Sequence, residues 1–183
     1  LVKTPGVVFA LAMAVRALTK EGDSVLIQPP VYYPFFEVIR DNNRKIVESP
    51  LLLTDGHYEI DFDDLEEKIA SQNVKLFLLC SPHNPVGRVY TSKEKPYTKE
   101  ELQKLGELCE RYHVFVVADE IHCDFAFQEH PHTIFAKACP RLEEKMILCT
   151  APSKTFNLAG LQVSNIWVPG KEVRDRFKAE INA

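Results

Sequence analysis

Residues 74–88 read VKLFLLCSPHNPVGR, and this stretch decides the fold class. Its first seven residues form an almost continuous apolar run, which is typical of a strand that is buried on both faces of a sheet. The two prolines and the glycine that follow predict a rigid turn at the end of that strand. We therefore expect a buried strand over Val74–Cys80 that leads directly into a tight loop.

Similar apolar runs recur along the chain, and segments with helical periodicity separate them. Strands are predicted over residues 24–28, 45–49, 74–80, 113–118, 146–150 and 162–168, and helices over residues 6–19, 33–42, 65–71, 99–112 and 173–183. Buried strands that alternate with helices predict a largely parallel sheet with helices on both faces, the doubly wound α/β class. Ligands of such sheets bind beyond the carboxyl ends of the strands, so the residues that follow each strand are the candidates for chemistry.

The composition is that of an ordinary globular protein with a buried core: 183 residues, 45% hydrophobic and 26% charged, with a net charge of −4. So mild a charge does not indicate a nucleic-acid or acidic-membrane partner, and no run approaches the roughly 20 apolar residues of a membrane helix. Five dispersed cysteines without a Cys-x-x-Cys pair favour free thiols and a cytoplasmic protein. His130 and His132 have no further ligands at zinc-like spacing, so no metal site is predicted.

The chain begins at Leu1 without a methionine and stops within a helix-like run. We therefore expect residues 1–183 to be one domain excised from a longer protein, with sequence missing at both ends.

Two candidate residues could bind a ligand through a helix start and a turn. Gly6 opens the first predicted helix, where free backbone N–H groups can bind a phosphate, although these residues alone favour a plain helix start. Asn84 lies in the turn after residues 74–80, where its amide faces a ligand or serves only to form the turn.

Two further candidates carry charge at strand ends. Asp119 follows an apolar strand, and a carboxylate buried there requires either a cationic partner or a role as a helix cap. Lys154 follows residues 146–150 among small and apolar residues, and desolvation by such neighbours favours the neutral amine that imine chemistry requires. The alternative for Lys154 is an ordinary lysine in a surface loop.

Five segments that contain these candidates resemble, in order and across essentially the whole chain, the pyridoxal-phosphate (PLP) enzymes of the aspartate aminotransferase fold. They read TPGVV (4–8), PPVYYPFF (29–36), CSPHNPVGRV (80–89), VVADEIHCD (116–124) and TAPSKTFNLAGLQ (150–162). Within that fold they are most similar to the cystathionine β-lyase, or carbon–sulfur lyase, branch. The resemblance implies the large PLP-binding domain of a homodimeric enzyme, in which a small domain and the partner subunit supply further residues.

The resemblance also implies individual roles. Lys154 would hold the cofactor as a Schiff base and move the substrate's Cα proton. Asp119 would keep the ring nitrogen protonated, which makes the ring an electron sink. Asn84 would hydrogen-bond the phenolic oxygen. Tyr32 would stack on the ring, with the adjacent Tyr33 as the less favoured choice.

The phosphate would be bound by the backbone around Gly6 and Val7 together with Ser153. Two positions depart from the aminotransferase pattern. Gln162 stands where these enzymes carry a phosphate-binding arginine, and a neutral amide cannot replace that bidentate cation. His122 stands where many carry a tyrosine that contacts the phenolic oxygen.

Both departures favour β-elimination over transamination. The predicted activity is therefore a PLP-dependent carbon–sulfur β-lyase that cleaves L-cystathionine or cysteine conjugates to a thiol, pyruvate and ammonia. An aminotransferase is the first alternative, because the same residues can serve it. A non-catalytic PLP-fold sensor or regulatory module is the second.

Overall fold

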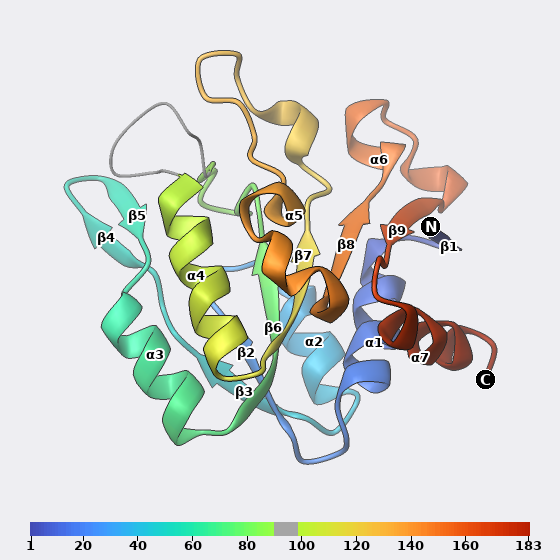
Figure 1. Ribbon diagram of the computed structural model, residues 1–183. Coiled ribbons are helices and arrows are strands. Elements are labelled where there is room, and N and C mark those ends of the chain that lie inside the picture. The colour runs from blue at the N-terminus through green and yellow to red at the C-terminus, as the bar shows by residue number, and fades with distance from the viewer. Residues whose placement is uncertain (90–98) are drawn as a thin grey trace.

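A seven-stranded sheet forms the centre of the molecule (Figure 1). The computed structural model describes residues 1–89 and 99–183. The strand order is β1-β9-β8-β7-β6-β2-β3. The strands are β1 (Val2–Thr4), β2 (Ser24–Ile27), β3 (Lys45–Glu48), β6 (Val74–Cys80), β7 (Phe115–Asp119), β8 (Met146–Thr150) and β9 (Ser164–Trp167).

Most neighbours in this sheet are parallel. The strands from β3 through β2, β6 and β7 to β8 pair in parallel, whereas β9 is antiparallel to both β8 and β1. The prediction of a doubly wound, mostly parallel α/β sheet is therefore confirmed. The carboxyl ends of the parallel strands all point to one side of the molecule, at the top of Figure 1.

Helices cover both faces of the sheet (Figure 1). One face packs against α1 (Val7–Leu18), α2 (Pro34–Arg40) and α7 (Lys171–Ile181), and the other against α3 (Phe62–Ser71), α4 (Lys99–Arg111) and α5 (Phe135–Ala138). Alternate residues of a strand point to opposite faces, so the parallel strands β2, β6, β7 and β8 each supply both cores. In β6, Leu76 and Leu78 join the first core, and Phe77 and Leu79 join the second.

The remaining elements are short: the strands β4 (Leu52–Thr54) and β5 (His57–Glu59), the helix α6 (Pro152–Thr155), and the 3-10 turns η1 (Cys123–Phe125), η2 (Pro140–Lys145) and η3 (Ala159–Leu161). The sequence did not predict the β4–β5 hairpin. Its turn is Asp55-Gly56, and both residues have positive φ, which matches the twist of a tight hairpin.

Several predicted boundaries differ from the structure by one or a few residues, and two of these differences have identifiable reasons. The helix predicted over residues 65–71 begins at Phe62, because the Asp61 carboxylate accepts hydrogen bonds from the backbone N–H groups of the first helical turn. The strand predicted over residues 162–168 begins only at Ser164, because Gln162 adopts a left-handed conformation that ends η3.

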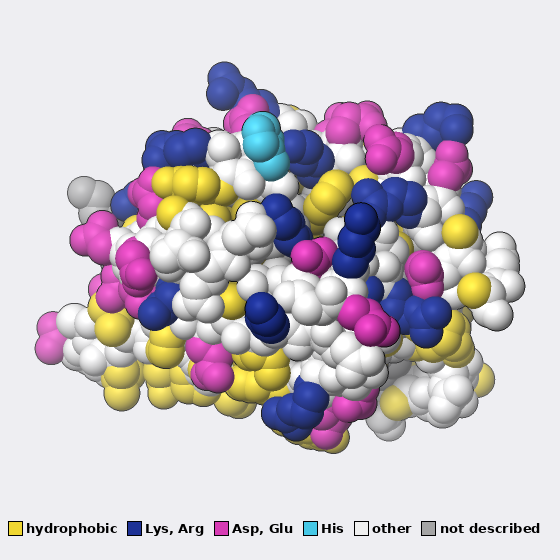
Figure 2. All heavy atoms as spheres, turned by 90° about the horizontal axis from the view of Figure 1, so that it is seen from below, with side chains coloured by type: hydrophobic (Ala, Val, Ile, Leu, Met, Phe, Trp, Pro, Cys, Tyr) yellow, Lys and Arg dark blue, Asp and Glu magenta, His cyan; other side chains and the backbone are white. Residues whose placement is uncertain are grey.

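The end of the molecule opposite the carboxyl ends of the strands carries charges of both signs. Figure 2 shows Lys and Arg side chains interspersed with Asp and Glu over that face. None of the helices in the described ranges combines the length and the apolar character that a bilayer crossing requires. All five cysteines are free, and four of them are buried.

Gly170 allows α7 to pack against η2 and gives a test of this packing. A Cβ at Gly170 would lie 2.6 Å from the carbonyl oxygen of Glu144, and the backbone there cannot easily move. We expect Gly170→Ala to lower the free energy of unfolding by about 1–3 kcal/mol. The control is Gly160→Ala, because a Cβ at Gly160 meets nothing within 4 Å. Urea denaturation of both variants checks the prediction, and equal midpoints would contradict it.

Candidate functional site

The carboxyl ends of three neighbouring parallel strands bring the candidate residues together. In the register of β6, β7 and β8, Asp119 stands between Cys80 and Cys149. A cavity of about 220 Å³ opens there, next to the beginning of α1. It is lined by Val7, Val8, Tyr32, Cys80, Asn84, Asp119, Ile121, His122 and Lys154.

Six of the eight predicted site residues line this cavity, namely Val7, Tyr32, Asn84, Asp119, His122 and Lys154. The other two, Gly6 and Ser153, are sequence neighbours of lining residues but do not line it themselves. Sequence reasoning missed Val8, Cys80 and Ile121. Each of these three is adjacent in sequence to a predicted site residue or ends a predicted strand, so position alone could have identified them.

Asp119 is the buried charge of the site. It ends β7 with 5% of its surface exposed, and its Oδ1 accepts a hydrogen bond of 3.1 Å from the backbone N–H of Ile121. The pKa of Asp119 is raised to about 7, mainly by burial and to a smaller extent by the nearby Glu120, whereas the Ile121 N–H and Lys154 act in the opposite direction. A cationic group placed against this carboxylate would favour its ionised form.

Lys154 lies on the single turn of α6 and reaches the cavity. The expectation that small and apolar neighbours desolvate it is wrong for this chain, because the Lys154 side chain is exposed. The reason is that the residues around it do not fold back over it: Phe156 is 66% exposed and Leu161 67% exposed.

Tyr32 and His122 form two walls of the cavity. The pKa of Tyr32 is raised, first by burial and then by Tyr33 and Asp119. The Tyr32 ring contacts the Tyr33 ring edge-on, with 5.3 Å between the ring centroids. Tyr33 is 65% exposed and does not line the cavity. The pKa of His122 is lowered by burial and by Lys154, so its imidazole is neutral at neutral pH.

The beginning of α1 presents unpaired backbone donors. Gly6 is the N-cap with φ 106°, a conformation that a side chain would strain. No side chain caps the helix, and its first turn contains no acidic residue. The N–H groups of a first helical turn have no partner within the helix, so those of Val7 and Val8 are available to an anion.

Gln162, the position of the expected arginine, does not line the cavity. It is exposed, and it follows η3 with φ 45°. Within residues 1–89 and 99–183, no three His, Cys, Asp or Glu side chains gather closely enough to hold a metal ion.

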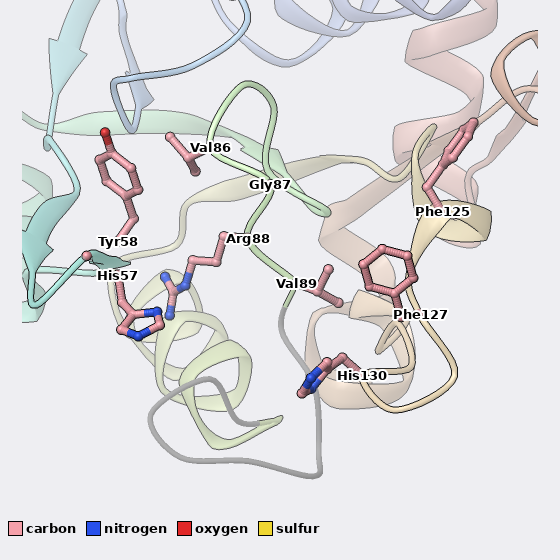
Figure 3. A pocket seen from close by; sticks show the side chains of 10 residues that line it. His57, Tyr58, Val86, Gly87, Arg88, Val89, Phe125, Phe127 and His130 are labelled. Atoms are coloured by element: carbon pink, nitrogen blue, oxygen red, sulfur yellow. The ribbon is translucent and has the colours of Figure 1, made fainter.

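A larger cavity of about 340 Å³ lies between the β4–β5 hairpin, residues 86–89 and residues 125–130. Figure 3 shows the Arg88 side chain pointing toward His57, and Phe127 lying beside Val89. None of the predicted site residues lines it. A hollow of about 320 Å³ joins the two cavities, because it shares Asn84 and His122 with the smaller one and Gly87, Val89, Phe125 and Phe127 with the larger one.

Known proteins of similar sequence show to which family this chain belongs. The family model described as aminotransferase class I and II matches residues 1–181. Cystathionine beta-lyase PatB of Bacillus subtilis (strain 168) is 49% identical over 178 residues, which cover 97% of this chain and 44% of that protein. The chain thus spans less than half the length of this curated relative.

Solved structures show the same architecture. The crystal structure of cystalysin from Treponema denticola, which contains a pyridoxal 5′-phosphate cofactor, matches with a TM-score of 0.92 and 45% identity over 99% of this chain and 44% of that one. The PLP-bound C-S lyase from Staphylococcus hominis matches with a TM-score of 0.90 and 37% identity, over 97% of this chain and 44% of that one.

The buried carboxylate gives a pH-dependent prediction. The folded-state pKa of Asp119, about 7, lies above the ordinary value of 3.8, so the folded chain loses stability as the pH rises from about 4 through 7. Asp119→Asn removes this loss and can still accept the bond from Ile121. We expect the variant to be more stable than the wild type at pH 8, by up to about 4 kcal/mol, and to lose that advantage near pH 4.

Urea denaturation of the cofactor-free protein at several pH values measures this difference. The exposed carboxylate Glu129, changed to Gln, serves as the control. A stability difference between Asp119→Asn and wild type that stays constant with pH would contradict the prediction.

Proposed function

The chain belongs to the aminotransferase class I and II family, and from that premise we propose that it is the PLP-binding large domain of a carbon–sulfur β-lyase. The proposed substrates are L-cystathionine and other cysteine conjugates, and the products are a thiol, pyruvate and ammonia. One observation carries the proposal: a single cavity combines an amine, a buried carboxylate, an amide and an aromatic ring, Lys154, Asp119, Asn84 and Tyr32. The similarity to proteins named as C–S lyases supports it further.

The chemistry of the cavity fits the groups of PLP. The Asp119 carboxylate is buried and has a raised pKa, so it suits a cationic partner such as a protonated ring nitrogen. The Asn84 amide can donate to a phenolic oxygen, and Tyr32 offers an aromatic face for stacking. The uncapped start of α1 suits a phosphate, and the Lys154 amine can bond to an aldehyde carbon.

Each residue then has a defined task. Bound PLP supplies an electron sink that stabilises negative charge at the substrate's Cα. Lys154, which lines the cavity from α6, takes the proton from Cα. Asp119 is held in place by the Ile121 N–H and favours a protonated ring nitrogen through its charge. His122, neutral at neutral pH, adds no positive charge that would oppose protonation of Lys154.

Transamination remains the alternative, because it needs the same base and the same electron sink. The histidine at position 122 and the glutamine at position 162 favour the lyase, since aminotransferases of this fold typically carry tyrosine and arginine there. A ligand sensor without catalysis is the third hypothesis. It is less favoured because the base and the carboxylate are both present.

The oligomeric state, the cellular location and the source of the substrate-binding arginine are also proposals. We propose a homodimer, in which exposed apolar side chains such as Tyr33, Phe156 and Leu161 are covered by parts of the protein beyond this structure. We propose a cytoplasmic location, because the five cysteines are all free. The arginine that binds the substrate carboxylate is expected in a small domain, as in other members of the fold.

Removal of the base gives the direct test. We expect Lys154→Ala to lower pyruvate release from L-cystathionine by about 10²–10⁴-fold, because the general base is lost. The protein is loaded with PLP, and pyruvate and thiol are assayed together. The matched control is Lys137→Ala on the exposed surface of α5, which should retain wild-type activity.

Two outcomes would contradict the lyase. Amination of an added 2-oxo acid without pyruvate release would make the protein an aminotransferase. Neither product, despite bound PLP, would favour the sensor.

A further inference from the structure

His83 is a buried histidine next to the cavity. It immediately precedes Asn84 and is only 2% exposed. Its Nε2 lies 2.9 Å from the backbone oxygen of Pro30. Burial lowers the pKa of His83 to about 4, so the ring is neutral at neutral pH. A carbonyl oxygen only accepts, which means that Nε2 carries the hydrogen and donates it.

This hydrogen bond connects two walls of the cavity. β2 and β6 are parallel neighbours, and the segments that follow them leave the sheet at the same edge. Pro30 lies two residues before Tyr32, in the segment after β2, and His83 lies one residue before Asn84, in the segment after β6. The bond between Pro30 and His83 therefore joins the segment of Tyr32 to the segment of Asn84.

Other contacts hold the Asn84 segment to itself and to α4. The backbone N–H of His83 donates to the oxygen of Arg88, and the Asn84 N–H donates to the Cys80 sulfur at 3.3 Å. The buried Arg88 guanidinium forms an ion pair of 2.5 Å with Glu101 on α4. These contacts fix the shape of the loop, whereas the His83 side chain fixes its position relative to the Tyr32 segment.

We infer that His83 is a positioning residue that sets the separation of Asn84 and Tyr32 across the cavity. His83 lines the adjoining hollow but not the cavity of about 220 Å³ itself, so it acts on that cavity through Asn84. The inference rests on the proposed function, in which the Asn84 amide donates to the phenolic oxygen of PLP. Such a bond favours the ionised phenolic oxygen, so it lowers the pH at which the visible absorption of the bound cofactor changes.

Two amide substitutions at His83 test whether its effect depends on the length of the side chain or only on its polarity. The amide nitrogen of glutamine extends about as far as the Nε2 of histidine, whereas that of asparagine is one carbon shorter. His83→Gln should keep the bond to Pro30 and the wild-type absorption midpoint. His83→Asn should lose the bond and raise the midpoint by roughly half a pH unit to one unit, the effect of one weakened hydrogen bond.

The experiment measures the visible absorption of the PLP-loaded protein as a function of pH. The proteins compared are the wild type, His83→Gln, His83→Asn, Asn84→Ala and the double variant of His83→Asn with Asn84→Ala. Asn84→Ala should raise the midpoint, and the double variant should match Asn84→Ala alone, because His83 acts through Asn84. His83→Met, which fills the volume without a donor, is the second test variant. Urea denaturation identifies which variants retain the wild-type unfolding transition.

Each failure has a distinct meaning. Wild-type protein that binds no PLP would overturn the proposed function and the inference with it. If the cofactor binds but Asn84→Ala leaves the midpoint unchanged, or folded His83→Asn and His83→Met leave it unchanged, the positioning role is wrong. Additive shifts in the double variant would show that His83 acts independently of Asn84 and would also overturn it.

Discussion

The parallel register of β6, β7 and β8 is the constraint on which the site depends. Apart from Lys75 in β6, these strands are apolar until their last residues, and in β7 that last residue is Asp119. Backbone pairing with Cys80 on one side and Cys149 on the other buries the carboxylate at the point where it lines the cavity. The same pairing brings the segments after β6 and β8 together, so a slip of one residue would separate Asn84 and Lys154 from Asp119.

Burial makes the ionised form of Asp119 unfavourable in the empty cavity, and it makes the carboxylate favour a cationic group as its partner. A second buried carboxylate, Glu120, follows it directly, but Glu120 has its own partners: the backbone N–H of Phe135 at 2.8 Å and His132 Nε2 at 3.3 Å. Asp119 has one backbone donor and faces the cavity. The protein thus stabilises one acid internally and leaves the other to be satisfied by whatever binds in the cavity, a division typical of functional sites.

The sequence predicted the central architecture because buried strands and amphipathic helices have strong periodic signals. It missed β1 and the β4–β5 hairpin, whose strands of three residues are too short for a period to emerge, although Asp55-Gly56 was a usable turn signal. Position at a strand end indicated Asn84, Asp119 and Lys154, whereas Val7, Tyr32 and His122 were predicted only from the resemblance to the PLP enzymes of the aspartate aminotransferase fold. The sequence could not predict that Lys154 is exposed, since exposure depends on how residues beyond α6 pack.

The two edges of the sheet differ from its middle in length and charge. β1 has only three residues and an exposed Lys3, and β3, at the other edge, exposes Lys45 and Glu48. Short or charged edge strands are poor templates for further backbone pairing, whereas a run such as that of β6 would be an effective one. A second chain is therefore disfavoured from extending this sheet strand by strand, and the molecule is protected from open-ended aggregation.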